Sequence, residues 1–151
     1  MAGVAMLRSI LLATSISAFA VVSTAAADPT NLGTPPVSNA GEPLNIGFVL
    51  YTKSRTPGTL NARWNYANAY SGPGVATGGP ATGGFAGRYH VRYFLENGVF
   101  SDEYDLDIER HTPGDFYDVT WITNGKISAK GVGMEVADGK SLAVGWRRVA
   151  D

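Results

Sequence analysis

The chain has 151 residues with 12 basic and 13 acidic side chains, so its net charge is −1, and it contains no cysteine. This near balance of charge, without a lysine- or arginine-rich run, argues against nucleic acids and anionic membrane surfaces as partners. The lack of cysteine excludes disulfide scaffolds, cysteine zinc sites and cysteine nucleophiles, while the aromatic content of 11% favours a β-strand core.

The first 27 residues have the pattern of a removable export signal. Arg8 is the only charge before Asp28, residues 10–22 form an apolar run diluted by Ser and Thr, and residues 25–27 are alanines. A basic start, a short apolar centre and a small-residue exit are typical of a secretory signal peptide. The run is short for a transmembrane helix, which needs about 20 apolar residues. We expect an exported protein, periplasmic or extracellular, with no membrane-spanning segment after cleavage; an uncleaved anchor or a buried helix is the alternative.

Residues 28–45 predict a flexible N-terminal segment, because they are rich in Pro, Gly, Asn, Ser and Thr and have no apolar period. Residues 46–151 form the expected domain, with no convincing helix. Its predicted strands cover residues 46–54, 59–69, 87–96, 99–110, 116–123, 126–136 and 141–149. This series predicts an all-β antiparallel meander of about seven to eight strands. We expect a small closed barrel, which leaves no strand edge exposed; a β-sandwich is the alternative.

A glycine-rich segment, residues 71–87, separates the second of these runs from the third. It contains Ala-Thr-Gly-Gly twice, beginning at Ala76 and at Ala81. It lacks the Lys-Ser/Thr ending of a phosphate-binding loop, and no helix is expected to follow it. We expect a loop that is either a lid over a barrel mouth or a tolerated insertion.

Three dipeptides predict tight hairpins: Asn97-Gly98, Asn124-Gly125 and Asp138-Gly139. Each suits a type I′ turn, whose two central residues need positive φ. Counted from Asn97-Gly98, the expected pairs are Glu96–Val99, Leu95–Phe100, Val91–Tyr104 and Tyr89–Leu106, with Arg92–Glu103, His90–Asp105 and Arg88–Asp107 on the other face. One face is apolar and the other pairs basic with acidic side chains, so a one-residue slip would destroy both patterns.

The other two hairpins make further predictions. Counted from Asp138-Gly139, the expected pairs are Val144–Gly133, Trp146–Gly131 and Glu135–Leu142, and we read the two strand glycines as room for the ring of Trp146. Counted from Asn124-Gly125, they are Ile122–Ile127, Thr120–Ala129 and Val119–Lys130. This last register leaves the core face of its hairpin undecided.

The C-terminal third carries a resemblance. Residues 117–121 read Tyr-Asp-Val-Thr-Trp, residues 131–134 Gly-Val-Gly-Met, and residues 142–146 Leu-Ala-Val-Gly-Trp. This succession resembles a pattern of uncharacterised exported bacterial proteins and is similar to the closing strands of calycin-type barrels, the lipocalin and avidin group. The resemblance implies a Trp on an early strand beneath an Arg of the last strand, roles that fall to Trp64 and to Arg148 or Arg147.

Six aromatic residues share the predicted apolar faces and are candidates for ligand binding: Trp64, Tyr66, Tyr89, Tyr93, Tyr104 and Trp146. They either line a cavity or fill the core, because a barrel of about eight strands leaves room for packed side chains or one small ligand. The first hypothesis is therefore a non-enzymatic barrel that binds a small apolar or aromatic molecule, without a cofactor.

The second hypothesis is an enzyme on a calycin-like barrel, a lyase, isomerase or cyclase. Its candidate catalytic residues are His111, Glu109, Asp118 and Arg148, and at least two of them must enter one cavity. The row of acids from Glu103 to Glu109 lies along an extended strand, which does not fold around a metal ion, so no metal site is expected. The third hypothesis is an inhibitor or interaction module of the cell envelope, presenting an apolar patch or a free edge at residues 46–54. The oligomeric state stays open.

Overall fold

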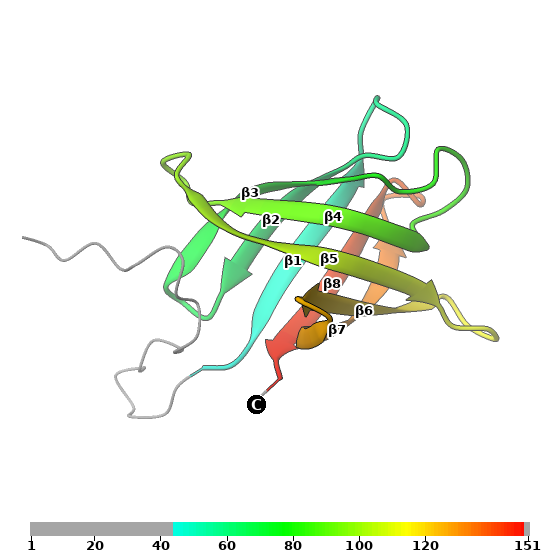
Figure 1. The fold of residues 1–151 in the computed structure, drawn as a ribbon. Helices are drawn as coiled ribbons and strands as arrows, with labels where there is room; N and C mark the ends of the chain where they lie inside the picture. The colour runs from blue at the N-terminus through cyan, green and yellow to red at the C-terminus, as the bar shows by residue number, and fades with distance from the viewer. Residues whose placement is uncertain (1–43, 150–151) are drawn as a thin grey trace, which may run out of the picture.

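The computed structural model describes residues 44–149, which form eight strands closed into one antiparallel barrel (Figure 1). The strands are β1 (Gly47–Lys53), β2 (Leu60–Tyr66), β3 (Tyr70–Thr77), β4 (Gly87–Phe94), β5 (Phe100–Arg110), β6 (Phe116–Thr123), β7 (Lys126–Val136) and β8 (Ser141–Arg148). The predicted signal peptide and residues 28–43 of the predicted flexible segment lie outside the described residues. Within the described range, no helix is long and apolar enough to span a membrane.

Each strand pairs with the next along the chain, and β8 closes the ring by pairing with β1. This confirms the closed meander and rules out the sandwich. It also corrects the expected free edge at residues 46–54, because β1 is hydrogen-bonded on both sides. Alternate residues turn inward and form a core in which the largest fully buried side chains are Tyr51, Tyr66, Tyr117, Phe85, Leu106, Ile108 and Leu142.

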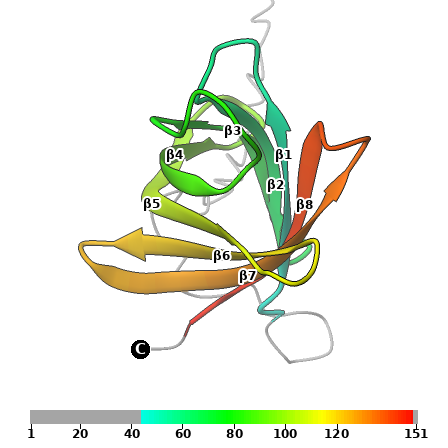
Figure 2. The same cartoon turned by 90° about the vertical axis from the view of Figure 1, so that its right-hand side faces the viewer.

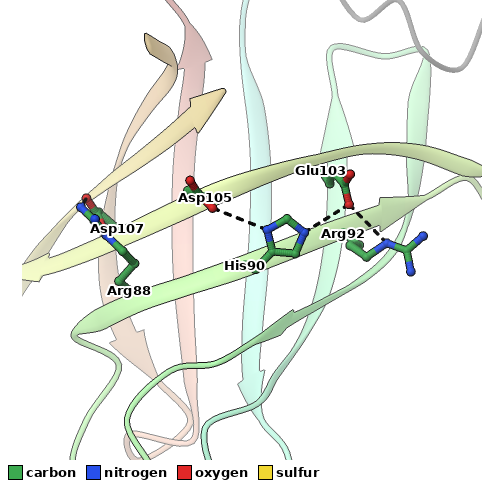
Figure 3. A network of polar contacts seen from close by, with 6 residues as sticks. All are labelled: Arg88, His90, Arg92, Glu103, Asp105 and Asp107. Carbon is green, nitrogen blue, oxygen red and sulfur yellow. Dashed lines mark hydrogen bonds and ion pairs between the residues drawn. The ribbon is translucent and has the colours of Figure 1, made fainter. Parts of the chain in front are cut away.

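The register predicted for β4 and β5 is confirmed along most of the hairpin, from Arg88–Asp107 to Arg92–Glu103. Figure 3 shows the outer face of this pair as a ladder of charges. Arg88 Nε lies 2.6 Å from Asp107 Oδ1, and His90 lies between Glu103, at 3.1 Å, and Asp105, at 3.6 Å. His90 therefore belongs to a solvent-facing ladder, as its predicted pairing implied.

The turn of the same hairpin differs from the prediction. Only Gly98 of the Asn97-Gly98 pair has positive φ, at 82°, and the amide of Leu95 donates to the carbonyl of Val99. Phe94 pairs with Phe100, so the predicted pairs Glu96–Val99 and Leu95–Phe100 are wrong. The extra residue in β5, Ser101, forms a bulge that restores the predicted register at Tyr93–Asp102.

The two remaining hairpins turn at their predicted dipeptides, whose residues all have positive φ. The pairs predicted between β7 and β8 are confirmed, including Trp146 opposite Gly131. In β7, Ser128 forms a second bulge, so Thr120 pairs with Lys130 and Val119 with Gly131, one residue away from the prediction. This shift settles the open question of the core face, since it turns Val119, Trp121 and Ala129 inward together.

Strand β3 occupies the first half of a segment that was predicted to be a loop. Its glycines let neighbouring groups approach closely. A Cβ on Gly72 would lie 1.9 Å from the carbonyl oxygen of Phe94, and one on Gly74 would lie 2.6 Å from the ring of Tyr93. Trp64 Nε1 fixes the strand by donating to the carbonyl oxygens of Pro73 and Phe94, at 3.2 and 3.0 Å.

Residues 78–86, between β3 and β4, cover one end of the barrel, the end that faces the viewer in Figure 2. Phe85 is fully buried there, with its ring at 86° to that of Tyr117, and Tyr89 donates to its carbonyl at 2.9 Å. Tyr117 in turn donates a hydrogen bond to Glu135 at 2.5 Å. The carboxylate that pairs across the strands with Leu142 therefore accepts a hydrogen bond from a buried tyrosine. This segment closes one end of the barrel, and the first residues of β1 and the last of β8 lie at the other (Figure 1).

Candidate functional site

A cavity lies inside the barrel toward the end opposite Phe85. Five aromatic rings line it: Trp64, Tyr93, Tyr104, Trp121 and Trp146. Two charged side chains also line it, Asp102 from β5 and Arg148 from the end of β8, and the remaining lining residues are Val49, Ser128 and Ala129. Its volume is ≈ 30 Å³, enough for one or two water molecules. A larger guest has to displace side chains, and Trp146 and Arg148 are among the half-buried lining residues.

Hydrogen bonds hold the floor of the cavity. Tyr51 and Tyr93 share a hydrogen bond of 2.5 Å between their hydroxyls, and Trp121 Nε1 donates to Tyr93 Oη at 2.8 Å. Burial raises the pKa of both tyrosines, so they stay neutral. The rings of Trp121 and Trp146 lie 5.9 Å apart and tilted by 45°, so the wall next to this floor is aromatic.

Asp102 is the unusual member of the cavity, because it places a carboxyl group among aromatic rings. Tyr104 donates its hydroxyl proton to Asp102 Oδ2. Asp102 Oδ1 is also buried, and no group among residues 44–149 donates to it. Burial raises the pKa of Asp102, an effect partly offset by hydrogen bonds from Tyr104 and Ser101 and by the charge of Arg148. A buried acceptor without a donor costs about 1–3 kcal/mol, and the cavity beside Asp102 has room for a group that donates to it.

Arg148 lines the same cavity as Asp102 and forms no ion pair with it. Its Nε is buried and donates to no acceptor among the described residues. The guanidinium lies over the ring of Tyr66, 5.2 Å from the centroid, so the ring beneath this arginine is Tyr66 and not the expected Trp64. Asn45 anchors the strand end by bonding the backbone N–H and C=O of Arg148, at 2.8 and 3.1 Å.

We expect Asp102→Asn to raise the free energy of unfolding at neutral pH by about 1–2 kcal/mol, because it removes a buried charge. The pKa of Asp102 is raised above its unfolded value of 3.8. The wild-type protein therefore loses stability as pH rises from that value through the folded pKa, and the variant does not. Urea unfolding at neutral and acidic pH checks this, and the difference should shrink as pH falls below 3.8. A variant that is less stable than the wild type at neutral pH would contradict the argument.

Four of the six predicted ligand-binding residues, Trp64, Tyr93, Tyr104 and Trp146, line this one cavity. The other two lie elsewhere in the core. Tyr66 stacks on Trp146 from behind, with centroids 5.0 Å apart, and Tyr89 packs beneath Phe85 at the closed end. Sequence reasoning missed Asp102 and Trp121 as members of the site. The signal for Asp102 was present, because the alternation that turns Leu106 and Tyr104 inward also turns Asp102 inward.

The four candidate catalytic residues do not meet in the interior cavity, and three of them lie together on the outer face. Arg148 alone lines the interior cavity. Glu109 and Asp118 are cross-strand neighbours on the outer face, at an open surface hollow, and His111 Nε2 lies 2.5 Å from Asp118 Oδ2 with both side chains half-exposed. Among residues 44–149, no three His, Cys, Asp or Glu side chains lie close enough to hold a metal ion.

Comparisons of the whole chain with protein-family models, curated proteins and solved structures find no match to any of them.

Proposed function

We propose that the protein is an exported binding protein that takes a small planar molecule into the aromatic end of its barrel. The observation that carries this proposal is the pair of buried atoms left without hydrogen bonds, Asp102 Oδ1 and Arg148 Nε, on the walls of one aromatic cavity. Buried polar groups are nearly always hydrogen-bonded. A guest that brings the missing donor and acceptor accounts for both atoms at once.

The two atoms define the chemistry of the guest. The carboxylate needs a donor and the guanidinium Nε needs an acceptor, so the guest carries both on one edge, as a primary amide does. The rings of Trp121, Trp146 and Tyr104 suit a flat apolar body. A carboxylate would satisfy Arg148 alone and an ammonium group Asp102 alone, which leaves one buried group unpaired in each case.

Benzamide is the simplest probe with these features, and benzoate and benzylamine are its matched analogues. Isothermal titration calorimetry should show saturable binding of benzamide, with both analogues about tenfold weaker or more, since a hydrogen bond to a charged group contributes about 1.5–3 kcal/mol. Asp102→Asn and Arg148→Met should each weaken benzamide to a similar degree. The control is Asp105→Asn, a carboxylate on the same strand that faces solvent.

Equal affinity of all three probes, or benzamide binding unchanged in both cavity variants, would contradict the proposed recognition. Export rests on the sequence of residues 1–27. Mass spectrometry of the exported chain tests it, with Asp28 as the expected first residue.

A further inference from the structure

The end of β8 is held on its β1 side by a side chain in place of a strand. Gly47 pairs with Trp146, and the same register would set Asn45 opposite Arg148. Since β1 begins only at Gly47, the amide of Asn45 replaces the missing backbone partner. Its Oδ1 accepts from the N–H of Arg148 at 2.8 Å, and its Nδ2 donates to the C=O of Arg148 at 3.1 Å. One side chain therefore satisfies both backbone groups of Arg148 that point toward β1.

Asn45 is also bonded to the tyrosine that lies beneath the guanidinium. The hydroxyl of Tyr66 donates to Asn45 Oδ1 at 3.3 Å. Burial raises the pKa of Tyr66, so the hydroxyl keeps the proton that it donates. The guanidinium of Arg148 lies 5.2 Å from the centroid of this ring, and the ring itself stacks on Trp146 at 5.0 Å. The amide therefore ties the backbone of Arg148 to the ring that supports its side chain.

We propose that Asn45 is a positioning residue that holds Arg148 in place for the guest, an inference that rests on the proposed function. Asn45 does not line the cavity, so it acts through Arg148, whose buried Nε has no acceptor among residues 44–149. Fixing the backbone and the supporting ring orders the arginine before a guest arrives. Ordering a long side chain only on binding would weaken affinity about two- to tenfold.

Asn65 provides a matched control near the start of β1. Its Oδ1 accepts from the N–H of Phe48 at 2.9 Å, and its Nδ2 donates to the C=O of Ala67 at 3.1 Å. Like Asn45, it bonds one backbone donor and one backbone acceptor with its side chain. Neither of these partners lines the cavity. Truncation of Asn65 therefore removes the same kind of hydrogen bonds without releasing Arg148.

Binding of benzamide, benzoate and benzylamine to Asn45→Ala tests the proposal. The variant should bind benzamide and benzoate about two- to tenfold more weakly than the wild type, because both probes need Arg148. Benzylamine engages Asp102 alone, so its affinity should not fall. Asn65→Ala should leave the affinities for all three probes unchanged. A general loss of structure would weaken the three probes alike, and that result overturns the positioning role.

A second measurement needs no guest and separates this inference from the proposed function. In NMR spectra of the ligand-free protein, Asn45→Ala should speed the exchange of the Arg148 Nε–H with water about two- to tenfold, because local opening then breaks fewer hydrogen bonds. Tyr66→Phe keeps the ring and removes the hydroxyl bond to Asn45, so it should change the exchange rate in the same direction by a smaller factor. Asn65→Ala should leave the rate unchanged.

The two measurements can fail separately. A wild type that binds none of the probes contradicts the proposed function, and the exchange rate then still decides whether Asn45 holds Arg148. Exchange that is unchanged in Asn45→Ala, or that rises equally in Asn65→Ala, overturns the inference. Circular dichroism shows whether each variant is folded, and if Asn45→Ala is not, Tyr66→Phe decides by the same two readouts.

Discussion

Replacing Phe85 by alanine is expected to lower the free energy of unfolding by about 3–5 kcal/mol, the range for a buried phenylalanine. The ring is fully buried, lies 6.4 Å from the ring of Tyr117 and carries the ammonium of Lys53 at 4.9 Å from its centroid. Its removal leaves a cavity at the closed end of the barrel, which adds to the loss of buried apolar surface. Chemical denaturation measures the change.

The control for this prediction is Val99→Ala, an apolar truncation at an exposed turn, for which a change within about 0.5 kcal/mol is expected. The comparison also decides the role of residues 78–86. These residues were expected to be either a lid or a tolerated insertion, and a tolerated insertion would give Phe85→Ala no more effect than Val99→Ala. A large loss shows that the segment is a structural closure of the barrel.

Gly72→Ala is expected to destabilise the barrel by more than about 3 kcal/mol. The new Cβ would lie 1.9 Å from the carbonyl oxygen of Phe94 and 2.9 Å from the carbonyl carbon of Leu95, so it meets backbone and not a flexible side chain. Strand β3 would have to move away from the end of β4, which also breaks the hydrogen bonds of Trp64 Nε1 to Pro73 and Phe94. Overpacking at a rigid site costs about 1–3 kcal/mol, and the lost hydrogen bonds add to it.

Gly145→Ala is the matched control, because it is also a strand glycine and its new Cβ would meet Phe48 Cε1 at 3.8 Å, an ordinary contact. Thermal unfolding followed by circular dichroism should show a large fall in midpoint for Gly72→Ala and little change for Gly145→Ala. Equal midpoints for the two variants would mean that β3 is not held against β4 in the way the structure shows.

The architecture could be predicted from apolar residues that recur at every second position of a strand and from turns that need positive φ. Tyr89 and Val91 alternate with Arg88 and His90, and this pattern fixed the pairing of β4 with β5. Strand β3 could not be found in this way, because Gly72, Pro73 and Gly74 have low strand propensity. Tertiary contacts hold it in place, through the indole N–H of Trp64 and the ring of Tyr93.

The errors in register have one physical cause. Counting from a turn assumes that both strands advance together, and a bulge adds one residue to one strand. Ser101 and Ser128 are the bulged residues, and no turn or propensity signal identifies either of them. Between β4 and β5, the turn moves the pairing one residue away from the prediction, and the bulge at Ser101 moves it back. Between β6 and β7, the turn gives the predicted pairing, and the bulge at Ser128 moves it away by one residue.

The candidate site was predicted only in part. Alternation identified the inward aromatic residues, but the choice between a cavity and a filled core depends on depth along the barrel, which alternation does not encode. Tyr66 and Tyr89 are inward like Trp64, yet they lie behind and beyond the cavity. Asp102 was not among the candidates, although its place opposite Tyr93 sets it among aromatic rings.

The most direct test of the binding cavity is the NMR response of the indole N–H groups when benzamide is added. Trp121 and Trp146 line the cavity beside Asp102 and Arg148. Benzamide should shift both of their indole resonances in a saturable way, and Asp102→Asn should abolish most of this response while Asp105→Asn leaves it intact. Indole resonances that do not move at millimolar benzamide, or that move equally in both variants, would contradict the assignment of this cavity as the binding site.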